Sequence, residues 1–175
     1  RQRQMCIRDS YRAGFRQSVA PLGTAVTEDH LYWLWKTVSE PIMCLDGDDA
    51  GKRAMARVVD LALPLLEPGK TLQFVVMPNK MDPDDMIQQQ GIAAFKQHLG
   101  QTMSLFEVVW NMEYYQQTLD TPDKFAGFED RMRKRIAKIA HKTVAKNYHS
   151  YLSEKLYQIR NERFKNSRPK GGTQA

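Results

Sequence analysis

Cysteine is scarce in this sequence, which has only Cys6 and Cys44 among its 175 residues. Two cysteines are too few for a disulfide scaffold or for a zinc site built from cysteine, so we expect a reducing, cytoplasmic environment. Long apolar runs are also missing, because a stretch such as residues 61–66 is far too short to cross a bilayer. The N-terminal arginines are not followed by the apolar segment of a secretory signal. These absences exclude disulfide-rich secreted proteins and membrane-spanning proteins.

The composition is that of a folded protein of modest size. Hydrophobic residues make up 42% of the chain and charged residues 26%, which supplies enough apolar material for a core and argues against wholesale disorder. The length suits one domain, or one small domain with an appendage. The first residue is arginine rather than methionine, so we expect the sequence to be a fragment of a longer protein.

The net charge of +6 is unevenly distributed along the chain. Residues 1–16 carry a net charge of +4, residues 17–124 carry −7, and residues 125–175 carry +9. An acidic middle beside a basic C-terminal part is typical of a protein with a nucleic-acid partner. A solvated basic helix face is the alternative interpretation.

Residues 1–10 show no periodicity and no helix caps, and the string MCIRDS resembles a translated sequencing-adapter remnant. We therefore expect no ordered structure there. Residues 17–20 favour a short strand, followed by a turn over residues 21–24. Thr27 is the expected N-cap of a helix that covers residues 28–39.

Two apolar runs then alternate with two helical patterns. Residues 41–45 and 72–77 lack polar alternation, as expected of strands buried on both faces of a parallel sheet, so Cys44 is expected to be a buried hydrophobic residue. The helix after the first strand is predicted to end near Pro64, and the helix after the second covers residues 86–99. This order predicts a βαβ unit in an α/β, Rossmann-like fold with a largely parallel sheet.

The rest of the chain is predicted to be helical as far as residue 164, with a flexible tail over residues 165–175. Helices are expected over residues 102–118, from an N-cap at Thr121 onward, and over residues 147–164. One helix face carries basic residues at positions i, i+3, i+7 and i+11, namely Arg131, Lys134, Lys138 and Lys142.

Six of the twenty acidic residues fall into two tight groups, which are Asp46, Asp48, Asp49 and Asp82, Asp84, Asp85. Each group directly follows a predicted strand, and parallel strands bring such positions to one edge of the sheet. Two like charges about 4 Å apart repel by about 4 kcal/mol at an effective dielectric constant of 20. The pKa values must therefore rise or a divalent cation must bind, and oxygen ligands without histidine or cysteine favour Mg²⁺ or Mn²⁺.

These aspartates also have interpretations other than a metal site. Turn aspartates that only increase solubility are the plain alternative. A phosphohydrolase with Asp46 as nucleophile and Asp48 as general acid also begins with a strand and Asp-x-Asp, but Ala50 stands where that class usually has Thr or Val. A P-loop is excluded because only three residues separate Gly47 from Gly51, and an EF-hand lacks its Gly and distal Glu.

Three stretches of the sequence closely resemble the Toprim domain of bacterial DNA primases of the DnaG type. They are EPIMCLDGDDAGKRA (40–54), LALPLLEPGKTLQFVVMP (61–78) and DPDDMI (82–87). Two further stretches fit the same family, AGFRQSVAPLGTAVTEDH (13–30) and TPDK (121–124). The resemblance implies a partial Toprim domain over residues 11–99 and a helical subdomain over residues 100–164.

The resemblance also implies a site and a reaction. By position, Asp46 and Asp48 resemble the metal-binding Asp-x-Asp of the family, and Asp82 and Asp84 resemble the acidic pair that completes its catalytic site. Such primases join ribonucleoside triphosphates into an RNA primer on a single-stranded DNA template. One Mg²⁺ (or Mn²⁺) ion would activate the attacking 3′-hydroxyl, and another would neutralise the phosphates and the leaving pyrophosphate.

The basic residues have two interpretations within this resemblance. They either contact the nucleic-acid backbone or support the catalytic lobe. The candidates are Lys52 and Arg53, which follow the first acidic group, together with Arg131, Lys134, Lys138 and Lys142.

The sequence departs from the family in ways that bear on activity. The family's Toprim domain opens with a strand carrying Glu-Gly-Tyr-Met-Asp, whose Glu is a metal ligand or base, and MCIRDS stands there without a Glu. The N-terminal zinc-binding domain, the basic half of the polymerase core and the C-terminal domain that binds the replicative helicase are missing. We therefore expect a primase fragment that is inactive alone, from a protein of the bacterial cytoplasm and replisome. The alternatives are another Toprim protein, nuclease or topoisomerase-like, and a non-catalytic metal-stabilised nucleic-acid-binding module.

Overall fold

The computed structural model describes residues 18–19, 25–78 and 81–167 of the chain. Within these ranges, no helix is both long and apolar enough to span a membrane. The elements follow one another in the order α2 (Glu28–Thr37), β1 (Ile42–Leu45), α3 (Asp49–Leu65), β2 (Gln73–Val76), α4 (Pro83–Leu99), β3 (Met103–Ser104), α5 (Leu105–Tyr114), α6 (Pro122–Ile136) and α7 (Lys142–Ser167).

The strands form one sheet in the order β1-β2-β3. β1 and β2 run parallel, with Met43 opposite Phe74, and the predicted strand-helix-strand unit is thereby confirmed. β3 runs antiparallel to β2, so the described sheet is mixed, and the parallel pairing of β1 with β2 is the longer of its two pairings. The sequence pattern predicts a helix from residue 102, but α5 begins only after Ser104, whose side chain caps it. A two-residue strand is too short to show a periodicity of its own.

The two faces of β2 are covered by different helices. Phe74 is fully buried in the main core with residues of α3 and α5, whereas Val75 packs in a smaller cluster with Met86 and Phe95 of α4. Alternate residues of a strand point to opposite faces of the sheet. Helices α3 and α5 therefore lie on one face and α4 lies on the other.

The prediction of a strand buried on both faces is wrong for β1. Met43 packs against the main core, but Ile42 is 48% exposed and Cys44 is also exposed. Val75, opposite Cys44, lies under α4, and no residue of β1 joins that cluster in the described part of the chain. An apolar run does not distinguish a strand covered on both faces from a strand covered on one.

Capping residues set two helix starts where the sequence predicts them. The Thr27 side chain accepts a hydrogen bond from the backbone N–H of His30, and the His30 side chain accepts one from the N-cap backbone. The Thr121 side chain caps α6 by accepting a hydrogen bond from the backbone N–H of Lys124, and Pro122 lies in the first helical turn. Each cap satisfies a backbone donor that the helix itself leaves free.

Several other limits differ from the prediction. α4 begins at Pro83 and contains a non-helical residue, Gly91, at φ 86° and ψ 166°. α7 begins at Lys142 and extends to Ser167, into the predicted tail. A capping aspartate moves the start of α4 toward the N-terminus, and polar periodicity is too weak to locate the start of α7.

Some predictions fall wholly or partly outside the described residues. The strand expected over residues 17–20 is described only at residues 18–19, which are not in a strand. Residues 1–10, the turn at 21–24 and the tail from residue 168 onward lie outside the described ranges.

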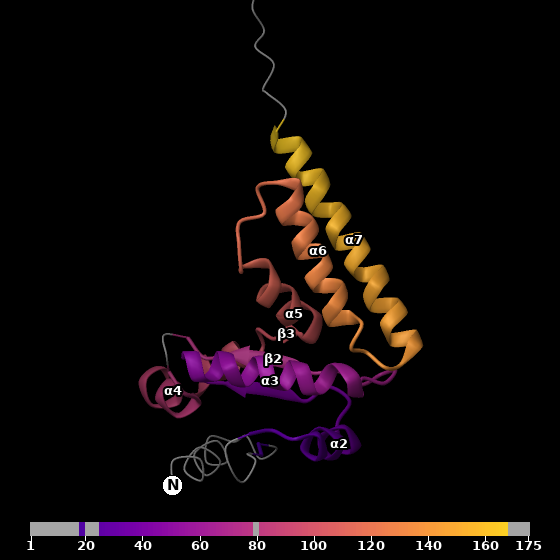
Figure 1. Ribbon diagram of the computed structural model, residues 1–175. Coiled ribbons are helices and arrows are strands. Elements are labelled where there is room, and N and C mark those ends of the chain that lie inside the picture. The colour runs from indigo at the N-terminus through magenta and orange to yellow at the C-terminus, as the bar shows by residue number, and fades with distance from the viewer. Residues whose placement is uncertain (1–17, 20–24, 79–80, 168–175) are drawn as a thin grey trace, which may run out of the picture.

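One hydrophobic core joins the two predicted parts of the chain. It contains Val59 of α3, Phe74 of β2, Val109 of α5, Phe128 of α6 and Leu152 of α7, each 2% exposed or less. Helices α6 and α7 lie side by side and extend away from the sheet (Figure 1). The described helical part therefore packs directly on the sheet and α3, and the boundary at residue 99 stays a prediction.

Candidate metal centre

The first acidic group lies at the carboxyl end of β1, where the chain turns into α3. Asp46 is exposed, and Asp48 is half-buried at the N-cap position of α3. One carboxylate oxygen of Asp48 accepts a 2.7 Å hydrogen bond from the backbone N–H of Gly51. This bond stabilises the helix start and orients the carboxylate, whose second oxygen can still bind another partner.

Gly51 allows this acidic turn to close tightly against α3. A Cβ atom at this position would lie 2.0 Å from the backbone oxygen of Asp46 and 2.8 Å from its carbonyl carbon. Backbone atoms cannot move aside as a flexible side chain can, so only glycine fits here. Sequence reasoning missed this role, because the spacing of Gly51 from the aspartates does not reveal how closely the helix approaches the turn.

The second acidic group occupies the loop and first turn that begin α4. One carboxylate oxygen of Asp82 accepts a 2.8 Å hydrogen bond from the backbone N–H of Asp85, and the Asp85 side chain accepts one of 3.3 Å from the backbone N–H of Asp82. Asp84 accepts a 2.7 Å hydrogen bond from the side-chain amide of Gln88. This reciprocal capping holds Asp82 at the positive end of a helix, as Asp48 is held.

Backbone hydrogen bonds join the two acidic turns. The Met77 N–H donates to the Leu45 carbonyl over 2.9 Å, and the Gly47 N–H donates to the Met81 carbonyl over 3.2 Å. These bonds continue the contact between β1 and β2 past the ends of both strands. The structure therefore places both acidic turns at the same edge of the sheet.

The oxygen donors at this edge are carboxylates from the two acidic turns. In the described part of the chain, no three His, Cys, Asp or Glu side chains gather closely enough to hold a metal. Mg²⁺ does not require such a cage, because it keeps several waters and binds proteins through one or two carboxylates plus substrate phosphates. Asp48 and Asp82 are hard oxygen donors fixed at adjacent turns. These residues fit an ion that shares its coordination sphere with water or phosphate.

Two candidate nucleic-acid contacts lie beside the first acidic turn. Lys52, in the first turn of α3, is 3.1 Å from the carboxylate of Asp49, and both side chains are largely exposed. Arg53 is exposed on the same helix. An exposed ion pair such as Lys52–Asp49 contributes little to stability.

The predicted continuous basic face is wrong, because it is divided between two helices. α6 ends at Ile136, Lys138 lies in the connection, and Lys142 opens α7. The N–H groups of Lys138 and Ile139 bond to carbonyls three residues back, which tightens the last turn and ends the helix. The regular spacing in the sequence therefore does not correspond to one stripe in space.

Three of these four basic residues form ion pairs within the chain. Arg131 binds Glu113 at 3.1 Å, Lys138 binds Asp60 at 2.8 Å, and Lys134 binds Asp130 at 2.7 Å. Lys142 is exposed and has no ion pair among the described residues. Arg131 and Lys138 thus support the packing of the helices, whereas Lys142 is exposed to solvent.

Glu113 is a buried acid that sequence reasoning did not identify. It is 3% exposed and accepts hydrogen bonds from the guanidinium groups of Arg131 and Arg135. Arg135 also pairs with Asp60 of α3, so the network links α3, α5 and α6. Burial acts to raise the pKa of Asp60, but Lys138 and Arg135 outweigh it and hold that pKa below its ordinary value. The partners of Glu113 lie 18 and 22 residues away, too far for any helical spacing to signal them.

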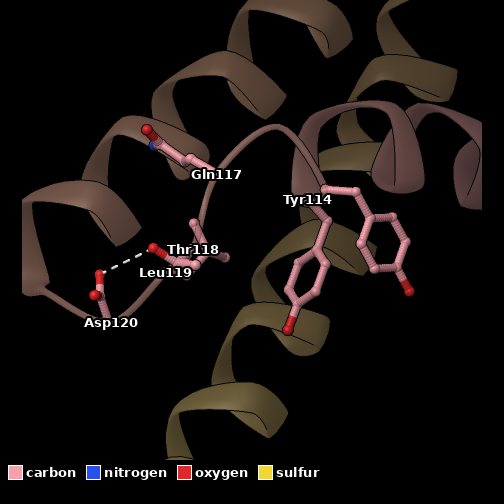
Figure 2. Close-up of a pocket in the computed structure, with 6 residues that line it drawn as sticks. Tyr114, Gln117, Thr118, Leu119 and Asp120 are labelled. Carbon is pink, nitrogen blue, oxygen red and sulfur yellow. Dashed lines mark hydrogen bonds between the residues drawn. The ribbon is translucent and has the colours of Figure 1, made fainter.

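A separate hollow of about 580 Å³ lies at the connection between α5 and α6 (Figure 2). Its lining consists of Tyr114, Tyr115, Gln117, Thr118, Leu119 and Asp120. The carboxylate in this lining, Asp120, is 2.7 Å from the ammonium of Lys124, which holds the pKa of Asp120 below its ordinary value. The lining includes neither acidic turn, so this hollow is not the candidate metal centre.

Several known proteins are similar to this chain in sequence. Residues 9–87 match the Toprim-like family. The chain is 37% identical over 148 residues to the DNA primase of Rickettsia felis and 33% identical over 143 residues to that of Escherichia coli K12. These alignments cover 85% and 82% of this chain but 25% of each relative, so the chain spans about a quarter of their length.

The fold matches a solved structure of the DnaG primase catalytic domain bound to single-stranded DNA. The TM-score is 0.78 with 31% sequence identity, over 87% of this chain and 48% of that domain. The chain therefore contains a Toprim domain and is a homologue of the catalytic core of DnaG-type DNA primases.

Proposed function

We propose that this chain is the metal-binding part of a primase catalytic core, which synthesises short RNA primers on a single-stranded DNA template. The observation that carries the proposal is the Gly47–Met81 backbone hydrogen bond, which joins two acidic turns at one sheet edge in a primase homologue. Ribonucleoside triphosphates are the proposed substrates. Their phosphates would complete a coordination sphere that the chain itself fills only in part.

The proposed ligands are Asp46, Asp48, Asp82 and Asp84. When bound, one or two Mg²⁺ or Mn²⁺ ions would neutralise phosphate charge and lower the pKa of the attacking hydroxyl. Asp48 and Asp82 each direct one oxygen to a backbone N–H, which limits the directions available to the second oxygen. The protein's part in the reaction is therefore to hold carboxylates at fixed positions before the substrate arrives.

The proposed nucleic-acid contacts are the exposed cations rather than the paired ones. Arg53 is close to the acidic edge in sequence, and Lys142 opens a helix of the basic C-terminal part. Such residues would neutralise backbone phosphates without reading base sequence. The solved homologous domain was captured with single-stranded DNA, which supports a DNA template as the partner. Contacts with a replicative helicase would be made by parts of the relatives that this chain does not cover.

A metal titration tests the proposed ligands directly. Mn²⁺ or Mg²⁺ is titrated by calorimetry into the full chain and into its Asp46→Asn and Asp48→Asn variants. We expect saturable binding by the unchanged chain and its loss in both variants, because each substitution removes a negative ligand. Equal binding by all three proteins would contradict the assignment of the site.

A primer-synthesis assay tests the reaction. We expect no primers from this chain alone, because it covers 48% of the solved catalytic domain. A version extended to the full length of the solved catalytic domain, including the upstream strand that carries the family's glutamate, should regain synthesis on single-stranded DNA. Cleavage of DNA by the extended protein would instead favour a nuclease or topoisomerase-like activity. Metal and DNA binding without either reaction would favour a non-catalytic module.

A further inference from the structure

Helix α4 folds back toward the strand that precedes it. Gly91 interrupts the helix with φ 86° and ψ 166°, a conformation that favours glycine. The segment after this residue carries Phe95, which packs with Val75 and Met77 at the end of β2. The same helix therefore begins at the second acidic turn and returns to the strand from which that turn emerges.

The returning segment places His98 against the end of β2. The Nε2 atom of His98 lies 2.9 Å from the backbone oxygen of Val76. A carbonyl only accepts hydrogen bonds, so Nε2 carries the proton and donates it. β3 pairs with β2 at Gln73 and Phe74, so Val76 lies beyond that pairing. The half-buried imidazole thus supplies the donor that a longer third strand would have supplied.

The bond to Val76 acts at the base of the second acidic turn. On the opposite side of the same strand end, the Met77 N–H is held by the Leu45 carbonyl. The end of β2 is therefore fixed from both sides, by β1 and by His98. The chain then reaches Met81, whose carbonyl accepts from Gly47, and Asp82, the N-cap of α4.

We propose that His98 is a positioning residue for the candidate metal centre. By holding the end of β2, it keeps Asp82 beside the turn that carries Asp48. The inference rests on the proposed function, since it concerns the same carboxylates. It assigns His98 no contact with metal or substrate, because its Nε2 atom already donates to Val76.

Two substitutions of equal polarity separate positioning from bulk packing. His98→Gln keeps a nitrogen donor the same number of bonds from Cα as Nε2, whereas the donor of His98→Asn is one bond closer to the backbone and cannot reach Val76. Mn²⁺ is titrated by calorimetry into the full chain and both variants, with Asp48→Asn as the reference for a lost ligand. We expect His98→Asn to weaken Mn²⁺ binding about tenfold and His98→Gln to bind as the unchanged chain does.

Hydrogen exchange without metal gives a second measurement. Amides of residues 81–86 should exchange faster in His98→Asn than in His98→Gln, while those of α6 stay the same in both variants. Equal Mn²⁺ affinity and equal exchange in the two variants would overturn the positioning role even if Asp48→Asn abolished binding. If Asp48→Asn left Mn²⁺ binding intact, the proposed function itself would fail, and the role of His98 with it.

Discussion

The backbone N–H of Gly47 donates a 3.2 Å hydrogen bond to the backbone carbonyl of Met81. These residues lie in different loops, each beside a group of aspartates. Charge repulsion between the loops opposes their approach, so this backbone bond and the packing beneath it must hold them together. The candidate site therefore depends on backbone positions as much as on its carboxylates.

Replacing Gly51 with alanine should disrupt the first acidic turn. The added Cβ would lie 2.0 Å from the Asp46 backbone oxygen, so the turn or the start of α3 must shift. We expect a loss of about 3 kcal/mol in the free energy of unfolding, typical of severe overpacking, together with loss of Mn²⁺ binding. Urea unfolding and calorimetric titration measure the two effects.

Gly127→Ala is the matched control for that substitution. A Cβ at Gly127 of α6 would lie 3.6 Å from a nitrogen of the Arg131 guanidinium, an ordinary contact with a flexible side chain. Because alanine favours a helix over glycine, we expect stability to rise by up to about 1 kcal/mol with Mn²⁺ binding unchanged. Equal losses of stability and of Mn²⁺ binding in Gly51→Ala and Gly127→Ala would show that the close approach at Gly51 has no special role.

Two substitutions of Asp48 separate helix capping from charge. Asparagine is as good an N-cap as aspartate, so Asp48→Asn should keep the bond to Gly51 and nearly all of the stability. Asp48→Ala removes the cap and should lower the free energy of unfolding by about 1 kcal/mol. Both should lose Mn²⁺ binding, as titration of each variant would show. If Asp48→Asn bound Mn²⁺ normally, Asp48 would be only a cap and the proposed function would fail.

Local patterns in the sequence predicted the features that depend on neighbouring residues. The caps at Thr27 and Thr121 follow from single side chains next to helical periodicity, and both are confirmed. The parallel pairing of β1 with β2 follows from two apolar runs joined by a helix. Each acidic group directly follows a predicted strand, and parallel strands end at the same edge of a sheet. The sequence therefore predicts both acidic turns at one edge of the sheet.

Features set by distant parts of the chain were not predictable from those patterns. The exposure of Cys44 depends on how far α4 extends across the sheet, and the return of α4 depends on a positive φ at Gly91. The burial of Glu113 depends on arginines of another helix. The division of the basic face arises because α6 ends before Lys138. Each of these depends on tertiary packing, to which local periodicity is insensitive.

Glu113→Gln should be among the most destabilising substitutions of a polar residue in this chain. Its side chain is 4% exposed, and those of its partners Arg131 and Arg135 are 28% and 22% exposed. Removing the negative charge leaves two partly buried guanidinium groups without their shared partner, which should cost about 3 kcal/mol in the free energy of unfolding. Urea denaturation measures the loss.

The surface pair Lys134–Asp130 provides the comparison for Glu113. Both side chains are well exposed, at 75% and 61%, so water already screens their attraction. We expect Lys134→Ala to change the free energy of unfolding by less than about 1 kcal/mol. A Glu113→Gln variant as stable as Lys134→Ala would mean that the buried network contributes little to the docking of α6.

Lys142 and Lys138 should differ in their effect on single-stranded DNA binding. Lys142 is exposed, whereas Lys138 is 2.8 Å from the Asp60 carboxylate. We expect Lys142→Ala to weaken binding and to reduce the salt slope of affinity by up to about 1, because one phosphate contact is lost. Lys138→Ala should leave the slope unchanged. Fluorescence anisotropy of labelled DNA at several salt concentrations measures the affinity and the salt slope of each variant. Equal slopes in the two variants would contradict the assignment of Lys142, but not Lys138, as a DNA contact.

Acidification should destabilise the chain in part through Glu107. The Glu107 carboxylate accepts one hydrogen bond from the backbone N–H of Ser104 and another from the Ser104 hydroxyl. These two bonds, the backbone one first, hold the pKa of Glu107 below its ordinary value of 4.5. A carboxyl whose pKa is lower in the folded state stabilises the fold above the unfolded-state pKa, and that contribution is lost as the pH falls through the folded-state pKa. Stability measured by urea unfolding from about pH 6 to about pH 3 should therefore fall less steeply for Glu107→Gln than for the unchanged chain. Parallel curves for the two proteins would mean that the cap at Ser104 does not favour the charged form of Glu107.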